Sequence, residues 1–189
     1  MKKVLLLGDS IRMGYDDYVK SELKEYDVYY DPIDNGRFIS YTIWMFNNLN
    51  NQHGPFDIVH FNTGYWDINR EGPNGEPQTP LKEYLSSLER LVNLIRSTGA
   101  TPIFATTTPI YDTPIKEGEY EALNYKNEWV IEYNEKAIEL MKKLGVQIND
   151  LYSLMLKEKR YGKCSDSLHL TEESYKKCAK QVSRIIRSI

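Results

Sequence analysis

The residues most able to do chemistry are a serine near the start of the chain and an acid–histidine pair near its end. Ser10 closes the tripeptide Gly-Asp-Ser, directly after the apolar run at residues 4–7. Asp166 and His169 are three residues apart, a spacing that fits one turn of chain. If the fold brings the two ends together, the carboxylate can orient the imidazole and the imidazole can deprotonate the serine hydroxyl. This combination predicts a serine hydrolase.

The other two histidines have simpler interpretations. His60 lies inside the apolar segment 57–62, which predicts a buried strand, so we interpret it as a core histidine. His53 lies in a polar segment and is expected to be solvated. Each catalytic motif alone also has a structural interpretation, because serine, aspartate and histidine are common at helix caps and on surfaces.

Length and composition are those of one globular domain. The 189 residues include 41% apolar and 27% charged residues, and no linker interrupts residues 1–189. The net charge of −3, with lysine and arginine scattered, disfavours nucleic-acid binding. The apolar stretches are too short to cross a membrane, and residues 4–7 are too short for a secretory signal. We therefore expect a cytoplasmic protein.

The two cysteines do not indicate a metal or redox site. Cys164 and Cys178 have neither the CxxC nor a zinc-ligand spacing, so we interpret both as reduced structural thiols. No cluster of metal-ligating residue types appears in the sequence. We expect no cofactor and no metal.

Segments that read as strands alternate with segments that read as helices. The expected strands are 4–7, 26–31, 57–62, 102–106 and 146–148. The expected helices are 11–25, a segment that begins at Ser40, 80–98, 119–144, 151–157 and the segment capped by Thr171. This alternation predicts a five-stranded parallel sheet with helices on both faces, an α/β architecture.

Parallel sheets of this kind bind ligands beyond the carboxyl ends of their strands. Five segments that are distant in sequence lie at or just past that edge. They are Ser10, Gly36, the turn 64–67, the pair 107–108 and the loop 166–169. We therefore expect them to converge on one rim.

Four of these segments resemble the motifs of the SGNH hydrolases, also called GDSL-type, a family of small esterases and lipases. Residues 8–10, followed by Gly14, are similar to the first motif, whose serine is the nucleophile. Gly36 falls where the family has a glycine whose N–H serves the oxyanion hole. Residues 166–169 resemble the last motif, which supplies the acid and the base. The resemblance covers the whole chain and implies a three-layer α/β/α, flavodoxin-like fold.

The chain departs from the family's third motif, Gly-x-Asn-Asp, whose asparagine donates to the oxyanion. Residues 64–67 read Gly-Tyr-Trp-Asp, so Trp66 stands where the asparagine is expected. The indole N–H of Trp66 is one possible replacement donor. The side chains of Asn62 and Asn35 are two others.

The expected reaction is a two-step acyl transfer. Ser10 attacks an ester carbonyl while His169 takes its proton, and Asp166 stabilises the imidazolium. The N–H groups of Ser10 and Gly36 are expected to hold the oxyanion, together with a third donor. Water then hydrolyses the acyl-enzyme by the same route.

The segments at the rim are polar or aromatic, which favours a small acyl group such as acetyl on a carbohydrate. A fatty acyl chain would require a long apolar groove. The rings of Tyr65, Trp66 and Tyr111 could stack on a sugar or simply pack the rim. Arg37 could bind an anionic group of the substrate or pair with a surface acid.

Other functions fit parts of the pattern. The family resemblance also extends to lysophospholipases and thioesterases. A non-catalytic relative is another possibility, as is a flavodoxin-like protein that binds a phosphate or nucleotide at the turn 8–10. In every enzymatic interpretation the partner is a small-molecule ester, with neither nucleic acid nor a membrane.

Overall fold

A five-stranded parallel sheet forms the centre of the molecule. The computed structural model describes residues 1–70, 75–110, 125–158, 160–162, 166 and 168–189. The strand order is β2-β1-β3-β4-β5, and every pairing is parallel. The strands are β1 (Lys3–Leu7), β2 (Asp27–Tyr29), β3 (Ile58–Phe61), β4 (Thr101–Ala105) and β5 (Gln147–Asn149). The predicted parallel sheet is confirmed.

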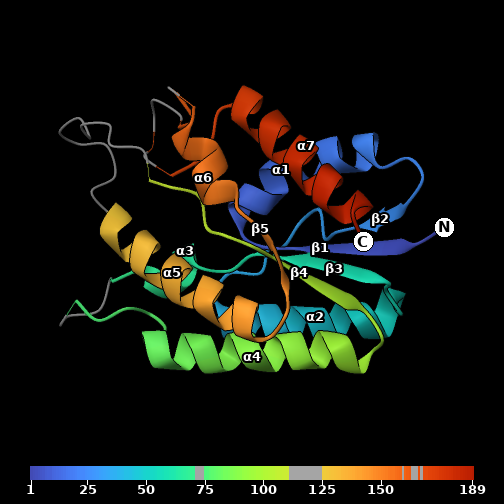
Figure 1. Ribbon diagram of the computed structural model, residues 1–189, viewed down its shortest axis with the longest axis horizontal. Helices are drawn as coiled ribbons and strands as arrows, with labels where there is room; N and C mark the ends of the chain where they lie inside the picture. Colours follow the sequence, from blue (N-terminus) through green and yellow to red (C-terminus); the bar gives the residue numbers. More distant parts are fainter. Residues whose placement is uncertain (71–74, 111–124, 159, 163–165, 167) are drawn as a thin grey trace.

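Helices cover both faces of the sheet (Figure 1), which confirms the three-layer α/β/α architecture. The helices are α1 (Ser10–Glu22), α2 (Ile39–His53), α3 (Tyr65–Ile68), α4 (Leu81–Ser97), α5 (Asn127–Lys143), α6 (Leu151–Leu156) and α7 (Glu172–Arg187). Helices α1, α6 and α7 lie on one face, and α2, α4 and α5 lie on the other. The strand order reverses at β1, so the crevice between the ends of β1 and β3 is the expected ligand position.

The central strands are mostly apolar because both of their faces are covered. All four residues of β3 are buried, and so are Val4 to Leu7 of β1. His60 of β3 has no exposed surface, which confirms the prediction of a core histidine. Its Nε2 lies 3.0 Å from the side-chain amide of Asn149, and burial lowers its pKa to about 3. The imidazole is therefore neutral and structural.

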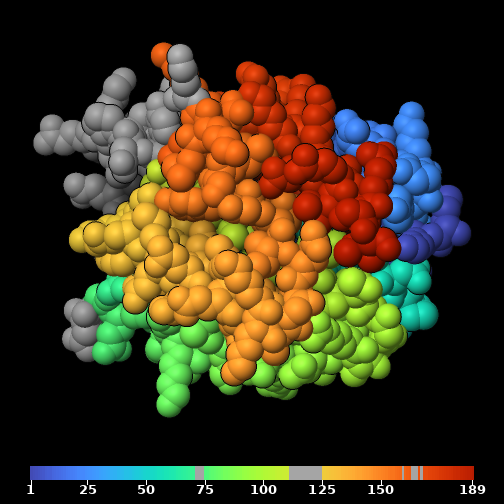
Figure 2. Space-filling view, in the orientation of Figure 1, coloured from blue at the N-terminus to red at the C-terminus, as the bar shows by residue number. Residues whose placement is uncertain are grey.

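The two ends of the chain meet because α1 packs against α7. In the space-filling view the red C-terminal helix lies beside the blue N-terminal part of the chain (Figure 2). Gly14 makes this contact possible, since a Cβ there would lie 2.2 Å from the ring of Tyr175. The glycine that follows Ser10 by one helical turn thus lets α7 approach the first turns of α1 closely.

Several predicted boundaries differ from the structure. Helix α5 begins at Asn127, because Lys126 is extended; residues 119–124 of the predicted helix lie outside the described residues. The short helix α3 was not predicted, since four residues are too few to show a helical period. His53 ends α2 and is half-buried, with its ring stacked on Tyr29 at 4.2 Å, so the prediction of a solvated side chain was wrong.

Two further features bear on the sequence predictions. None of the helices described above is long and apolar enough to cross a membrane. Cys178 is a free thiol buried in α7, and burial raises its pKa to about 12, as expected for a structural cysteine. Cys164 lies outside the described residues.

Replacing Gly14 with alanine should destabilise the protein. Alanine gains up to about 1 kcal/mol over glycine in a helix interior, but a methyl group forced against a buried ring costs about 1–3 kcal/mol. We expect Gly14→Ala to lower the free energy of unfolding by about 1–2 kcal/mol, measured by urea denaturation. Lys20→Ala, at an exposed position of the same helix, is the control. A Gly14→Ala protein as stable as the parent would contradict this account of the α1–α7 contact.

Candidate active site

A hydrogen-bonded chain links residues from the two ends of the sequence. The Oγ of Ser10 lies 2.8 Å from Nε2 of His169. The Nδ1 of the same ring lies 3.2 Å from Oδ2 of Asp166. The structure therefore brings together all three residues that the sequence motifs singled out, at distances that allow proton transfer.

The turn after β1 leaves the hydroxyl of Ser10 available. Asp9, not Ser10, caps α1, because its Oδ1 accepts a hydrogen bond of 2.9 Å from the N–H of Ile11. Asp9 is buried, and burial raises its pKa. Since Asp9 fulfils the capping role, the Oγ of Ser10 can face His169 at the first position of the helix.

The loop that carries the acid and the base is shaped by the acid itself. Oδ1 of Asp166 accepts hydrogen bonds from the N–H groups of Leu168 at 3.0 Å and of His169 at 2.6 Å. Partial burial raises the pKa of Asp166, but these N–H groups and the imidazole outweigh it, so the pKa lies below its ordinary value. The charged carboxylate favours a proton on Nδ1, which leaves Nε2 to accept from Ser10.

The same loop is tied to α7. The N–H of Leu170 donates to the hydroxyl of Tyr175 at 3.3 Å, and Leu170 also pairs with Gly162 in an isolated bridge. Thr171 caps α7 as predicted, accepting from the N–H of Ser174. The ring that packs over Gly14 therefore also holds the residue next to His169.

Arg12 holds the segment that leads into Gly36, and the sequence motifs did not reveal it. Its side chain is 1% exposed and forms an ion pair of 2.6 Å with Asp16. Its guanidinium also donates to the backbone carbonyls of Asp31 at 2.8 Å and Asp34 at 2.7 Å. Burial raises the pKa of Asp16 to about 7, against the opposing charge of Arg12. The buried arginine thus fixes the segment that leads into Gly36.

The glycine expected in the oxyanion hole makes a contact within the fold. The N–H of Gly36 donates to the carbonyl of Gly8 at 2.7 Å. A Cβ at Gly36 would lie 2.8 Å from Oγ1 of Thr42, so only glycine fits this approach. This hydrogen bond holds the loop against the end of β1 and occupies the N–H that the resemblance assigns to the oxyanion.

The asparagine proposed as a third donor is also engaged. The side-chain amide of Asn62 donates to the carbonyl of Ala105 at 2.8 Å and lies 3.4 Å from Oγ1 of Thr107. Both contacts are buried and link β3 to β4, so the structure favours the other candidate donors over Asn62. The direction of a side chain at a strand end depends on its neighbours, which the sequence does not display.

Two other candidate donors are less engaged. The indole of Trp66 is 41% exposed, and its N–H makes no hydrogen bond within the described part of the chain. The amide of Asn35 has only a weak contact, 3.8 Å from the sulfur of Met13. Both residues follow strands at the carboxyl edge of the sheet.

The residues expected to bind substrate have different environments. Tyr65 is 2% exposed and donates to the carbonyl of Thr108 at 2.5 Å, so it packs the rim and cannot stack on a substrate. Tyr111 lies outside the described residues. Arg37 pairs with Asp34 at 2.9 Å and lies over the ring of Tyr41 at 4.4 Å, which matches the surface-pairing alternative.

No three histidine, cysteine, aspartate or glutamate side chains of the described ranges are grouped so that they could hold a metal ion. The arrangement of Ser10, His169 and Asp166 can do nucleophilic chemistry with these side chains alone. Its Oγ can form a covalent bond, and its imidazole can move a proton to and from the reacting groups.

Comparison with known proteins gave matches among solved structures only. No family model matches the sequence, and no curated protein does. A carbohydrate acetylesterase family member from Sinorhizobium meliloti has a TM-score of 0.77 and 19% identity, over 100% of this chain and 98% of that one. An acetyl xylan esterase has a TM-score of 0.74 and 16% identity, over 97% and 99%. A GDSL-like lipase from Bacteroides thetaiotaomicron has a TM-score of 0.72 and 16% identity, over 100% of this chain and 89% of that one.

The fold is that of the GDSL hydrolases. The similarity extends over nearly the full length of each chain, so the expectation that came from the sequence motifs is confirmed at the level of the fold. It also explains why the residues that resemble the first and last GDSL motifs lie next to each other.

Asp67 ends the segment that was compared with the third GDSL motif, and its carboxylate holds two parts of the fold together. It is buried, and its carboxylate accepts from the N–H of Ile39 at 3.0 Å and from the hydroxyl of Thr63 at 2.6 Å. It thereby satisfies the first N–H of α2, which has no acceptor within the helix. Burial raises the pKa of Asp67 to about 6, although these hydrogen bonds lower it.

This raised pKa predicts a pH-dependent stability. Between about pH 4 and pH 6 the folded protein keeps a proton on Asp67 that the unfolded chain has released, so rising pH favours unfolding. The amide of Asp67→Asn does not titrate, so this variant does not lose stability in this way as the pH rises. We expect the stability of the variant relative to the parent to rise by about 2–3 kcal/mol from pH 4 to pH 7, in urea denaturation at each pH.

Asp27→Asn, at an exposed position of β2, is the control for loss of one negative charge. A stability difference between parent and Asp67→Asn that stays constant over this range would show that folding does not raise the pKa of Asp67.

Proposed function

We propose that the protein is a serine esterase that removes short acyl groups, in particular acetyl, from carbohydrate. The observation that carries the proposal is the hydrogen-bonded chain from Ser10 through His169 to Asp166. A nucleophile, a base and an orienting acid at these distances fit acyl transfer. The flavodoxin-like binding protein considered as an alternative gives this chain of contacts no role.

In the proposed reaction Ser10 Oγ attacks the ester carbonyl and His169 Nε2 takes its proton. The imidazolium is stabilised by Asp166 and then protonates the departing alcohol. Water, deprotonated by the same nitrogen, attacks the acyl-enzyme and releases the acid and free Ser10. All the proton transfers use one imidazole, so the proposed steps require no metal or cofactor.

The oxyanion is proposed to bind at the start of α1. The N–H of Ser10 opens this helix and has no acceptor within it. The N–H of Gly36 would have to be shared with the carbonyl of Gly8. The indole N–H of Trp66 is the donor we propose for the position that asparagine has in the family, with the amide of Asn35 as the alternative.

Two observations support a short acyl group on a carbohydrate. Arg37, Asp34 and the exposed ring of Trp66 give the described part of the rim a polar and aromatic character, which suits a sugar. Among the similar folds are a carbohydrate acetylesterase and an acetyl xylan esterase. Lysophospholipase and thioesterase activities are the alternatives that a chain-length series would reveal.

A series of p-nitrophenyl esters from C2 to C12 tests both the nucleophile and the acyl group. We expect the highest kcat/KM at C2, and Ser10→Ala should lower kcat by about 10⁴- to 10⁶-fold, because the nucleophile is lost. Ser21→Ala, at an exposed position near the end of the same helix, is the matched control and should keep full activity.

Equal turnover by Ser10→Ala would rule out this serine as the nucleophile. A maximum at C8 or longer would contradict only the short-acyl part of the proposal. A fluorophosphonate should add covalently to the parent and to Ser21→Ala, seen as a mass increase, but not to Ser10→Ala.

A pair of substitutions tests the donor at Trp66. Trp66→Phe keeps a ring but removes the N–H, and loss of one oxyanion donor lowers kcat by about 10²–10³-fold. Trp66→Asn places the family's amide at the position, so kcat should hold or rise. An unchanged kcat in Trp66→Phe would exclude the indole as a donor, and a collapse in Trp66→Asn would show that the ring itself is needed.

A further inference from the structure

We propose that a hollow on α2 and α4 binds a sugar ring of the substrate chain, some distance from the ester that is cleaved. The hollow measures about 270 Å³ and is lined by Ser40, Ile43, Trp44 and Asn47 of α2 with Ser87 and Arg90 of α4. The inference rests on the proposed function, because it names the substrate as an oligosaccharide or polysaccharide rather than a free small ester.

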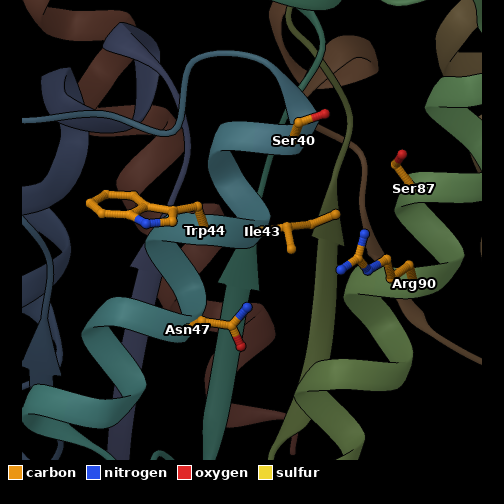
Figure 3. A pocket seen from close by; sticks show the side chains of 6 residues that line it. All are labelled: Ser40, Ile43, Trp44, Asn47, Ser87 and Arg90. Carbon is orange, nitrogen blue, oxygen red and sulfur yellow. The ribbon is translucent and has the colours of Figure 1, made fainter.

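The residues that line the hollow include one exposed aromatic side chain and several polar groups. Trp44 is 55% exposed, which is unusual for so large an apolar side chain. In Figure 3 the side chains of Ile43 and Arg90 point toward one another between α2 and α4, and the ring of Trp44 extends to the other side of α2, away from α4. The guanidinium of Arg90 has no acidic partner within the described part of the chain. It is therefore available to a hydroxyl or carboxylate of a ligand.

This chemistry suits a sugar better than a protein partner. The C–H face of a sugar ring packs on an aromatic face, and its hydroxyls bond to hydroxyl, amide and guanidinium groups. Apart from Trp44, the only apolar side chain in the lining is Ile43, which is 7% exposed. Stable protein interfaces need an apolar centre within about 1,200 Å² or more of buried surface. The hollow is smaller than the roughly 300–1,000 Å³ that encloses a whole ligand, so it fits one unit of a longer chain.

Stacked side chains connect the loop after Gly36 to Trp44, one of the residues that line the hollow. The Arg37 guanidinium lies 4.4 Å from the ring centre of Tyr41, and that ring lies 5.2 Å from the ring of Trp44. Tyr41 is also bonded to Asp34 at 2.5 Å. Trp44 is about 8 Å along the helix axis from the first residue of α2, at 1.5 Å per residue. A saccharide could therefore extend from Gly36 along Tyr41 to Trp44.

Binding can be measured without any ester. The parent protein labelled with ¹⁵N shows indole N–H signals for Trp44, Trp66 and Trp129, and Trp44→Phe assigns the first. Unsubstituted xylohexaose, cellohexaose and hexagalacturonate are each titrated to several millimolar. We expect at least one to shift the Trp44 signal to saturation while the Trp129 signal stays in place. No shift of the Trp44 signal with any of the three would overturn the inference.

Turnover gives the second measurement. We compare the KM for acetylated xylan with the KM for p-nitrophenyl acetate. The first divided by the second should rise about three- to tenfold in Trp44→Ala and be partly restored in Trp44→Phe. Leu156→Ala, which removes a similarly exposed apolar side chain from α6, should leave the ratio unchanged. An unchanged ratio in Trp44→Ala would count against the hollow.

The two proposals can fail separately. If the protein hydrolyses no ester but shows the saturating shift, the saccharide site is supported and the esterase proposal is contradicted. If the protein is an active esterase but shows no such shift, the esterase proposal is supported and saccharide binding in the hollow is contradicted.

Discussion

The candidate site depends on one contact, the hydrogen bond between a serine at the start of the chain and a histidine near its end. Ser10 and His169 are 159 positions apart, and their 2.8 Å separation requires α1 and α7 to lie together on one face of the sheet. Gly14 allows that approach, and Tyr175 both packs over it and bonds to Leu170. The helix contact and the position of the imidazole are thus set by the same ring.

Buried charge beneath the rim holds the remaining parts in place. Arg12 donates to two backbone carbonyls of the segment before Gly36. Asp67 accepts from the first N–H of α2, the helix that follows the Gly36 loop. Burying such groups costs free energy unless they are bonded, and the raised pKa values of Asp16 and Asp67 reflect that cost. The loop is therefore fixed from both ends, which is what a site with preorganised donors requires.

The sheet, the helical layers and the hydrogen-bonded residues Ser10, His169 and Asp166 could all be predicted from the sequence. Parallel strands put Ser10 and the loop 166–169 at one edge, and both carry residue types whose chemistry is distinctive. Arg12 was missed because two of its partners are backbone carbonyls 19 and 22 residues away. Every residue has a carbonyl, so residue types do not indicate such partners. The sequence left the roles of Asn62 and Tyr65 open, because residues at strand ends can point into the fold or toward solvent, and packing against Thr107 and Thr108 decides which.

The hydrogen bond from Gly36 to the carbonyl of Gly8 connects these observations. Gly8 lies two residues before the proposed nucleophile, so this bond ties the loop to the same turn that presents Ser10. Arg37, the next residue, has a φ of 47°, a left-handed conformation that a non-glycine residue keeps only when its surroundings hold it there. The ion pair with Asp34 and the ring of Tyr41 supply that support. Any displacement of the loop would therefore move both the turn at Ser10 and the first turn of α2, which couples the geometry of the candidate site to the aromatic surface beside it.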